Sequence, residues 1–316
     1  NEGSNRKPSP FNAGEHNGTG SYNDYYDYYT GYIHSIYIFS IFTIFISILG
    51  ILGNGMVIWL LIFCVKRNHF TTYVLNLAIA DFGFLITLTI LIFFWLQIYL
   101  QISFTLFSLF NFICSFMFCT SQYLLTVISV DRYVSVFFPL WHHCRQPTHL
   151  SATVCALIWI LSFLPPGISF ILRVTDLWIL DHVLLYQFIL NGFLCLPLMT
   201  ISSLTLFIKF WCKSKQQRRK KLLTIILVNV FFFIFFSFPI NAYSLFYIGI
   251  TYLPFTIMCA CLNSSVNPLI YYLVGRPKKG RSKKSMKAAL QNLFKEGENP
   301  AGTVHSQITM EEKLLI

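Results

Sequence analysis

Seven long apolar stretches follow one another along the chain, separated by short polar connections. They cover residues 33–65, 70–96, 102–130, 150–172, 183–208, 222–248 and 252–274. A hydrocarbon layer about 30 Å thick is crossed by roughly 20 residues of helix, so each stretch can span a membrane with some tilt. Lipid offers the backbone no hydrogen-bond partners, and a helix satisfies every N–H and C=O group within one segment. The pattern predicts an all-α membrane protein, a seven-transmembrane helix bundle.

The charges of the connections alternate from one side of the predicted bundle to the other. One side carries most of the basic residues: Lys66, Arg67, Arg145, six between 213 and 221, and seven between 276 and 287. The opposite side carries Arg6, Lys7 and Arg173, and the acids Glu15, Asp24, Asp27, Asp176 and Asp181. Short cytoplasmic loops are enriched in Lys and Arg, so the N-terminus is predicted to be extracellular.

This orientation divides the chain into four parts. They are an extracellular N-terminal tail (1–32), the seven-transmembrane bundle (33–275), an interfacial helix (276–295) and a cytoplasmic tail (296–316). The interfacial helix is expected to lie on anionic lipid, because its apolar residues share one face and lysines surround them. A solvated basic tail is the alternative. In the N-terminal tail, Asn17 begins a glycosylation sequon on the side where glycans are attached.

Composition narrows the class of protein. The chain is 55% hydrophobic with a mean hydropathy of +0.62, which is too apolar for one soluble core. Its net charge of +11 comes mostly from the side predicted to face anionic lipid, so nucleic acid is not an expected partner. The chain holds no HExxH, GxSxG or P-loop motif, and no enzyme activity is expected. All nine cysteines lie within spans or at their cytoplasmic ends, so no extracellular disulfide is predicted.

Polar residues inside the spans are the candidate functional positions, because ionisable groups are costly at membrane depth. Asp81 lies near the middle of the second span, and the first and seventh spans supply Asn54, Asn263, Ser264 and Asn267. A carboxylate here must be protonated, hydrogen-bonded or paired with a cation, and hard oxygen ligands suit Na⁺. Interhelical hydrogen bonding without any ion is an equally good interpretation. No other metal site is indicated.

The third span ends on the acid-arginine-tyrosine triplet Asp131, Arg132 and Tyr133. An adjacent acid and arginine at the membrane boundary can pair with each other in one state, while the arginine turns to other partners in a second state. The alternative is a simple boundary anchor, which a three-residue motif on its own favours.

Prolines interrupt three of the later spans. In the seventh span Pro268 lies between Asn267 and Tyr271, where it frees a backbone carbonyl that a neighbouring Asn can bind. Pro197 and Pro239 mark similar points in the fifth and sixth spans. Each such kink is either a point of movement or a purely structural bend.

Taken together and in this order, the motifs resemble those of rhodopsin-like G-protein-coupled receptors. The matching residues are Gly53-Asn54, the run Asn76 to Asp81, Asp131-Arg132-Tyr133, Trp159, Pro197, Pro239 and Asn267-Pro268-Leu269-Ile270-Tyr271. More narrowly, several runs resemble the Mas-related receptors. They are Leu124 to Val130, Ser135-Val136, Pro139-Leu140-Trp141, Cys144-Arg145-Gln146-Pro147, Pro197-Leu198-Met199 and Asn263-Ser264-Ser265-Val266-Asn267-Pro268.

The resemblance implies roles for individual residues. A sodium pocket that favours the inactive state would consist of Asp81, Ser121, Asn263, Ser264 and Asn267. Arg132 would engage a heterotrimeric G protein after the inner ends of the fifth and sixth spans swing outward, and Tyr271 would help to hold that open form. It also implies a multi-pass protein of the plasma membrane with arrestin as a second cytoplasmic partner.

The chain departs from the wider family at four places, one of which is Thr205, where the family has a tyrosine in the fifth span. Phe107 stands where most relatives carry the cysteine of an extracellular disulfide, and Ser237 replaces a tryptophan of the sixth span. Arg219 stands where many relatives carry an acid that would bind Arg132, so the resting restraint on Arg132 is expected to come mainly from Asp131. We expect some basal signalling, which silence without agonist at matched expression would contradict.

The extracellular side gives only weak indications of a ligand. Polar residues near the predicted outer pocket are Arg173, Asp176, Asp181, Gln187 and Asn241. The two acids suit a cationic peptide or amine, Arg173 suits an anionic metabolite, and solvated loop charges are the alternative to both. There are two alternative functions. One is a receptor with mainly constitutive signalling, and the other is an ion-conducting or transport protein that uses Asp81.

Overall fold

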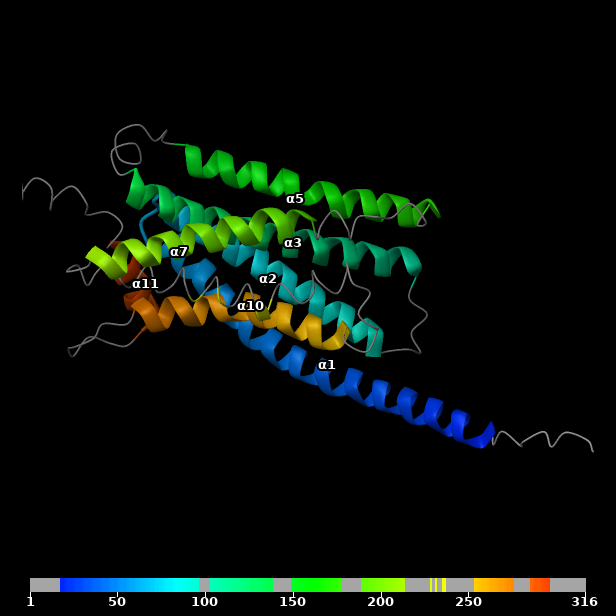
Figure 1. Ribbon diagram of the computed structural model, residues 1–316. Coiled ribbons are helices and arrows are strands. Elements are labelled where there is room, and N and C mark those ends of the chain that lie inside the picture. The colour runs from blue at the N-terminus through cyan, green and yellow to red at the C-terminus, as the bar shows by residue number, and fades with distance from the viewer. Residues whose placement is uncertain are drawn as a thin grey trace, which may run out of the picture.

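The computed structural model describes residues 18–96, 103–138, 149–177, 189–213, 253–275 and 285–295, with positions 228, 231, 235 and 236. Its helices are α1 (Gly18–Phe63), α2 (His69–Leu96), α3 (Phe104–Phe137), α5 (Leu150–Val174), the π-helical segment η2 (Ile189–Cys195), α7 (Leu196–Lys213), α10 (Leu253–Gly275) and α11 (Met286–Lys295). The long helices lie side by side in a bundle, with the short α11 at one end (Figure 1).

The surface of the bundle is apolar, as a lipid-embedded surface must be. Six helices of the described chain are long and apolar enough to cross a membrane. Large apolar side chains of α1 point outward, with Ile41 65%, Phe45 61% and Leu52 66% exposed. Such a surface is stable only in contact with lipid or another apolar surface. The all-α membrane fold is therefore confirmed, while the sixth predicted stretch, 222–248, lies almost wholly outside the described residues.

The helix α1 begins earlier than its apolar stretch. The sequence places residues 1–32 in a tail, but α1 starts at Gly18 and continues to Phe63, while its membrane-spanning part is Ile33–Phe63. A helix satisfies its backbone hydrogen bonds internally, so it has no physical reason to stop where the hydrocarbon layer ends. The apolar pattern therefore marks where the membrane lies and does not mark where the helix begins.

The helix α3 lies at the centre of the described bundle. It packs against α2, α5 and α7, while α1 packs against α2 and α10. One apolar core joins α2, α3 and α7 through fully buried side chains such as Leu77, Leu124 and Met199. A second core joins α1, α2, α10 and α11 and contains Val57, Tyr271 and Leu290. Polar residues of α2, α3 and α10 meet at Asp81, and Asn54 of α1 binds α10.

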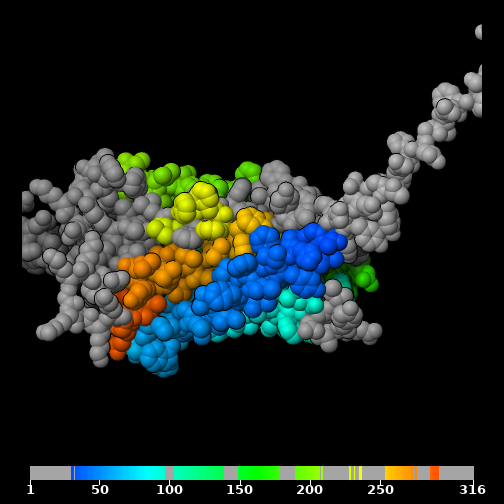
Figure 2. Space-filling model, turned by 90° about the horizontal axis from the view of Figure 1, so that it is seen from below, coloured from blue at the N-terminus to red at the C-terminus, as the bar shows by residue number. Residues whose placement is uncertain are grey.

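The contact between α1 and α10 depends on close approach of the two backbones. Figure 2 shows the two helices lying against each other along one face of the molecule. Ser265 donates its hydroxyl to the carbonyl of Ile46 at 3.3 Å, and Ser47 is hydrogen-bonded to the thiol of Cys261 at 3.1 Å. A Cβ added at Gly50 would collide with the side chains of Ser265 and Leu85. Small residues thus let the helices approach closely enough for these bonds.

Replacing Gly50 by Ala is expected to destabilise the protein by about 1–3 kcal/mol, because the added methyl group would push α1 away from α10. The matched control is Gly31→Ala in the same helix, where an added Cβ meets nothing within 4 Å. That change should leave stability unchanged or raise it by up to about 1 kcal/mol. Thermal unfolding of the detergent-purified protein measures both, and a Gly50→Ala protein as stable as the wild type would contradict the expected contact.

Candidate functional site

The carboxylate of Asp81 is the polar centre of the bundle. The residue is 0% exposed on α2. Ser121 of α3 donates its hydroxyl to Oδ1 at 2.6 Å, and Asn267 of α10 donates from Nδ2 to Oδ2 at 2.7 Å. Three helices therefore meet at one carboxylate, and each of its oxygen atoms accepts a short hydrogen bond from a neutral group.

Two further polar residues of α10 lie buried at the same level of the bundle. The side chain of Ser264 lies near the carboxyl group of Asp81, yet its Oγ has no partner in hydrogen-bond geometry among the described residues, and neither has Nδ2 of Asn263. Buried polar atoms are normally satisfied by protein, water or an ion. The oxygens of Asp81, Ser121 and Ser264 are the hard ligands that Na⁺ prefers, so the residues present fit that ion.

The backbone carbonyl that Pro268 leaves without its helical donor is bound by a residue of α1. Pro268 has no N–H, so the carbonyl of Ser264, four residues earlier, lacks its helical donor. Asn54 supplies the missing donor, because its Nδ2 lies 3.1 Å from that carbonyl and 3.0 Å from the carbonyl of Gly50. A Cβ on Gly53 would lie 3.1 Å from Pro268, so glycine leaves room for the proline ring. The amide of Asn54 therefore joins α1 to α10 one turn before Pro268.

Tyr271, one turn beyond the proline, is 4% exposed and belongs to the core shared by α1, α2, α10 and α11. Leu290 of α11, 0% exposed, packs in the same core. The side chain of Gln291 donates to the carbonyl of Cys64, just beyond the end of α1, at 3.3 Å. The short helix is thus fixed against both α1 and the segment that follows Pro268.

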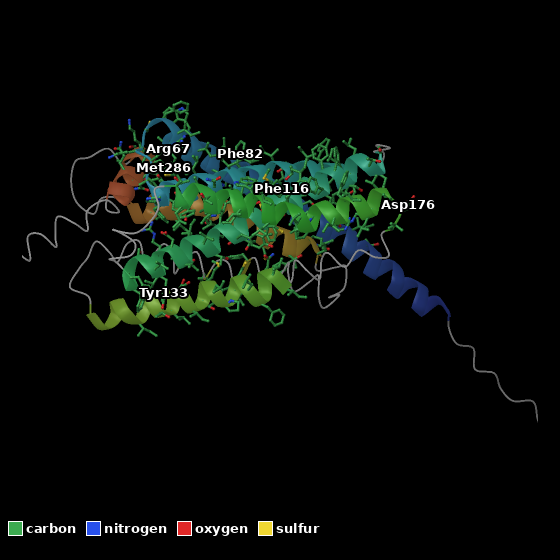
Figure 3. The ribbon with its side chains drawn as sticks, turned by 90° about the horizontal axis from the view of Figure 1, so that it is seen from above. Arg67, Phe82, Phe116, Tyr133, Asp176 and Met286 are labelled. Carbon is green, nitrogen blue, oxygen red and sulfur yellow. The ribbon has the colours of Figure 1, made fainter. Side chains whose placement is uncertain are left out.

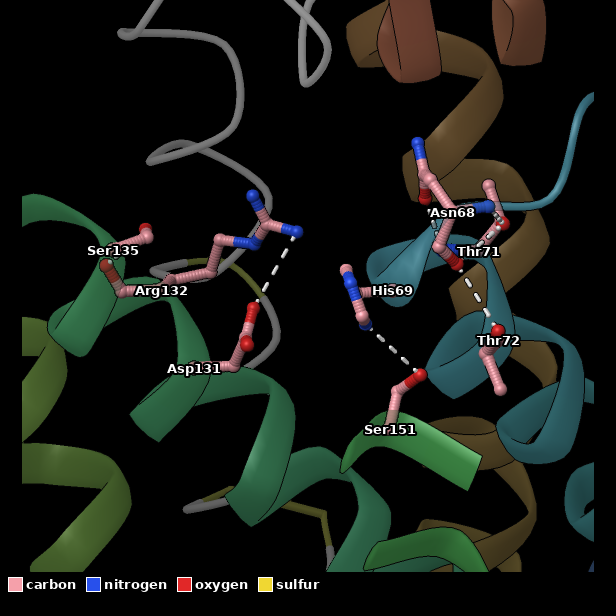
Figure 4. A network of polar contacts seen from close by, with 8 residues as sticks. All are labelled: Asn68, His69, Thr71, Thr72, Asp131, Arg132, Ser135 and Ser151. Carbon is pink, nitrogen blue, oxygen red and sulfur yellow. Dashed lines mark hydrogen bonds and ion pairs between the residues drawn. The ribbon is translucent and has the colours of Figure 1, made fainter. Parts of the chain in front are cut away.

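Asp131 and Arg132 pair at the end of α3. Nη2 of Arg132 lies 3.6 Å from Oδ2 of Asp131, and the two side chains are only 13% and 9% exposed. Figure 4 shows the Arg132 side chain extending from α3 toward the first turn of α2, which carries His69. Tyr133 points elsewhere, because its ring stacks on Phe137 with centroids 4.5 Å apart.

One aromatic residue next to this pair was not singled out by its sequence pattern. The guanidinium carbon of Arg132 lies 3.6 Å from the centroid of the Phe70 ring on α2. A phenylalanine at the start of an apolar span carries no signal of its own, because any apolar residue fits that pattern. Only the relative placement of α2 and α3 reveals the contact.

The region around Pro197 departs from regular α-helix. The π-helical segment η2 runs from Ile189 to Cys195, and Pro197 is the second residue of the α7 helix that follows it. A proline is well tolerated in the first turn of a helix, where its missing N–H leaves little unsatisfied. The π turn buries Asn191 and Cys195. Pro239, the corresponding proline of the sixth span, lies outside the described residues.

The candidate ligand residues are only partly described. Arg173 and Asp176 lie at the end of α5, whereas Asp181, Gln187, Asn241 and the sequon residue Asn17 fall outside the described residues. The helix ends in a Schellman motif, in which Leu177 N–H donates to Leu172 O at 2.9 Å and Asp176 N–H to Arg173 O at 3.4 Å. Asp176 adopts the left-handed backbone of this motif, with φ 59°, and its side chain is exposed. Its position is therefore explained by helix termination alone.

Replacing Asp176 by Gly is expected to stabilise the protein by about 0.5–1 kcal/mol, because glycine adopts positive φ without strain and the change removes a negative charge from a helix C-terminus. Asp176→Ala, which keeps a Cβ in the strained conformation, is the matched control and should be less stable than the glycine variant. Thermal unfolding in detergent distinguishes them. A glycine variant that unfolds before the alanine variant would argue against this backbone geometry.

The described ends of the bundle differ in character. Arg67, Tyr133 and Met286 lie at one end, and Asp176 lies at the other (Figure 3). The first end contains the Asp131–Arg132 pair and α11, and the second contains the exposed end of α5. Asp81, Asn267 and Ser121 form a buried network between them. Such an arrangement suits a protein that binds different partners on the two faces of a membrane.

Comparison with known proteins identifies the class. Residues 53–271 match the model of the 7 transmembrane receptor (rhodopsin family). The chain is 40% identical to Mas-related G-protein coupled receptor member H of Rattus norvegicus over 261 residues, 77% of this chain and 79% of that protein. Identity is 34% to Proto-oncogene Mas of Rattus norvegicus over 262 residues, 78% of this chain and 80% of that protein. Identity to Mas-related G-protein coupled receptor member F of Homo sapiens is 32% over 287 residues, with shares of 82% and 80%.

The fold and these matches define a seven-transmembrane receptor of the rhodopsin family. Within it, the chain belongs to the Mas-related G-protein-coupled receptors. It is accordingly a multi-pass receptor of the plasma membrane rather than an enzyme, and its family implies an extracellular ligand and a G protein as partners.

Proposed function

We propose that this receptor binds its ligand at the end of the bundle that carries Asp176 and activates heterotrimeric G proteins at the end that carries Arg132. The N-terminus is then extracellular, in agreement with the many basic residues in the connections on the Arg132 side. The observation that supports the proposal most strongly is the pairing of Arg132 with Asp131 at 3.6 Å in a nearly covered position. A covered arginine at the bundle rim can be released to bind a protein partner.

Activation depends on the buried network that separates the two ends. The carboxylate of Asp81 joins α2, α3 and α10, and any rearrangement of α10 at Pro268 must change its bond to Asn267. Na⁺ bound by Asp81, Ser121 and Ser264, with Asn263 and Asn267 around it, favours the resting arrangement. The ion is an allosteric ligand and no cofactor is required.

The ligand is a peptide, cationic in its contact with the receptor, or a small metabolite. The exposed carboxylate of Asp176 and the half-buried Arg173 are the described charges at that end of α5, and they would attract ligand groups of opposite sign. The second acid of this loop, Asp181, and the polar residues Gln187 and Asn241 contribute to the same proposed pocket.

The cytoplasmic side offers two further contacts. The helix α11 buries Ala289 and Leu290 against the bundle and exposes Lys287, which suits an amphipathic helix on an anionic inner leaflet. Arrestin is the proposed second partner of the same cytoplasmic face after activation.

The test uses cells that express the full chain with an N-terminal epitope. Antibody binding to intact cells is expected, since the N-terminus is proposed to be extracellular. G-protein dissociation sensors covering the Gα families are then recorded without ligand and with a panel of cationic peptides and small metabolites. Activation by a member of the panel, without membrane current, supports the proposal. An epitope detected only after permeabilisation would overturn the proposed orientation. A current that Asp81→Asn abolishes would overturn the proposed function in favour of an ion-conducting protein.

Mainly constitutive signalling is the second candidate function. It is favoured by Arg219, a basic residue where an acid would restrain Arg132 in many relatives. High ligand-free activation that no member of the panel increases would select this alternative.

A further inference from the structure

We propose that Phe70 is a positioning residue that restrains Arg132 in the resting receptor through a cation–π contact. The guanidinium carbon lies 3.6 Å from the centroid of the Phe70 ring. A cation within about 6 Å of a ring centroid is attracted by the negative face of the ring, most strongly where water is excluded. The Arg132 side chain is 13% exposed, so water screens this contact only weakly.

The ion pair with Asp131 does not by itself hold the guanidinium tightly. Its N···O distance of 3.6 Å is longer than that of a charge-assisted hydrogen bond, which is about 2.8 Å. The Nε atom of Arg132 is buried and has no hydrogen-bond partner among the residues that the structure describes. Part of the guanidinium is therefore held by the aromatic face rather than by polar atoms.

The turn that carries Phe70 is unusually well fixed. Asn68 caps α2, because the Thr71 N–H donates to Oδ1 of Asn68 at 2.8 Å and the Asn68 N–H donates to Oγ1 of Thr71 at 2.7 Å. His69 is hydrogen-bonded to Ser151 of α5 at 3.3 Å, which ties the same turn to a second helix (Figure 4). These two connections hold the turn at a fixed position beside α3.

Packing fixes the ring itself. Phe70 is partly buried and lies against both apolar cores, the one that contains Leu124 and the one that contains Tyr271. It therefore touches the cluster around α3 and the cluster around the end of α10. A movement of α10 that disturbs the second core would also loosen the ring, so Phe70 is placed to release Arg132 when the bundle opens.

The proposal rests on the proposed function and is tested through ligand-free G-protein activation, normalised to surface expression. Phe70→Leu removes the aromatic face but keeps an apolar side chain, and it is expected to raise basal activation about fivefold. Phe70→Tyr keeps the aromatic ring, and its basal activation should equal that of the wild type. The matched control is Phe94→Leu at the opposite end of α2, a half-buried phenylalanine whose ring contacts Phe110 and is far from Arg132.

A purely steric role is separated by changing the electrons of the ring and not its shape. Trifluorophenylalanine introduced at position 70 by nonsense suppression weakens the negative face with little change of size. Basal activation is expected to rise toward the level of Phe70→Leu, with a smaller rise for monofluorophenylalanine. Basal activation equal to that of the wild type with the trifluorinated ring would overturn the proposal.

A second measurement needs no G protein, so failure of the proposed function is distinguishable from failure of this inference. Thermal unfolding of the purified full chain is compared for the wild type, Phe70→Leu, Arg132→Ala and the double variant. If the ring binds the guanidinium, the two single losses are not additive and the double variant loses less than their sum. Additive losses would overturn the contact, whatever the signalling result.

Discussion

Replacing Arg132 by Ala is expected to lower G-protein activation at least about 30-fold at matched surface expression, because the G protein loses its proposed contact with this cation and truncating a charged residue in an interface costs about 2–5 kcal/mol. In the structure the Arg132 side chain contacts both Asp131 and the ring of Phe70. Only a long, flexible side chain that ends in a charged group can leave this position and bind another protein. Dissociation sensors, with and without an activating ligand, measure the loss.

The matched control is Arg67→Ala. Arg67 is an exposed arginine at the same end of the bundle, in the connection between α1 and α2, so the variant removes the same charge without touching the pair. It should signal as the wild type does. Equal losses in both variants would mean that overall charge at the cytoplasmic face matters, and that Arg132 has no special role in coupling.

The membrane-spanning architecture could be predicted from the sequence because lipid imposes a simple constraint. Each described span overlaps a predicted apolar stretch, as α2 (His69–Leu96) does with residues 70–96, although α3 continues to Phe137, beyond the predicted end at residue 130. The apolar pattern does not show where a helix begins outside the membrane, as α1 does at Gly18. It also does not show where α-helical hydrogen bonding changes to π-helical, as in Ile189–Cys195. Neither feature changes the hydrophobicity of the residues involved.

The sequence predicts which polar residues are buried, but it does not predict which hydrogen bonds they form. Asp81, Asn54 and Asn267 stand out because polar groups are costly in lipid. The sequence could not say that Asn267 bonds the carboxylate while Asn54 bonds the carbonyl freed by Pro268. These hydrogen-bond partners depend on how α1 and α10 are rotated about their axes. That rotation depends in turn on small residues such as Gly50.

Apolar residues with a functional contact are the hardest to predict. Phe70 differs in no way from the other phenylalanines of a chain that has 33 of them. Its contact with Arg132 depends on a capped turn that sets it beside α3, and the cap consists of two ordinary residues, Asn68 and Thr71. A capping pair such as Asn68 and Thr71 at the start of a span can be recognised in the sequence. It indicates a turn that is rigid enough to position a side chain.

Sodium is expected to stabilise the wild-type receptor against thermal unfolding and to have no such effect on Asp81→Asn. At ten times its dissociation constant, an ion that binds only the folded protein adds about 1.4 kcal/mol. The physical reason is the incomplete polar environment at Asp81, where the Oγ atom of Ser264, an oxygen that can bind Na⁺, lacks a partner in the described structure. A sodium ion beside Asp81 would bind the Ser264 hydroxyl oxygen and also neutralise the carboxylate charge. The hydrogen bonds from Ser121 and Asn267 alone do neither.

The measurement compares NaCl with N-methylglucamine chloride at equal ionic strength, so that screening is the same in both. Asp176→Asn makes the same chemical change at an exposed site and should keep the full sodium effect. Ser264→Ala should weaken sodium binding while leaving the hydrogen bonds from Ser121 and Asn267 to Asp81 in place. If sodium stabilised wild type and Asp81→Asn equally, the ion would bind elsewhere. If it stabilised neither, Asp81 would act through its hydrogen bonds to α3 and α10 alone, and the network would be a structural junction without an ion.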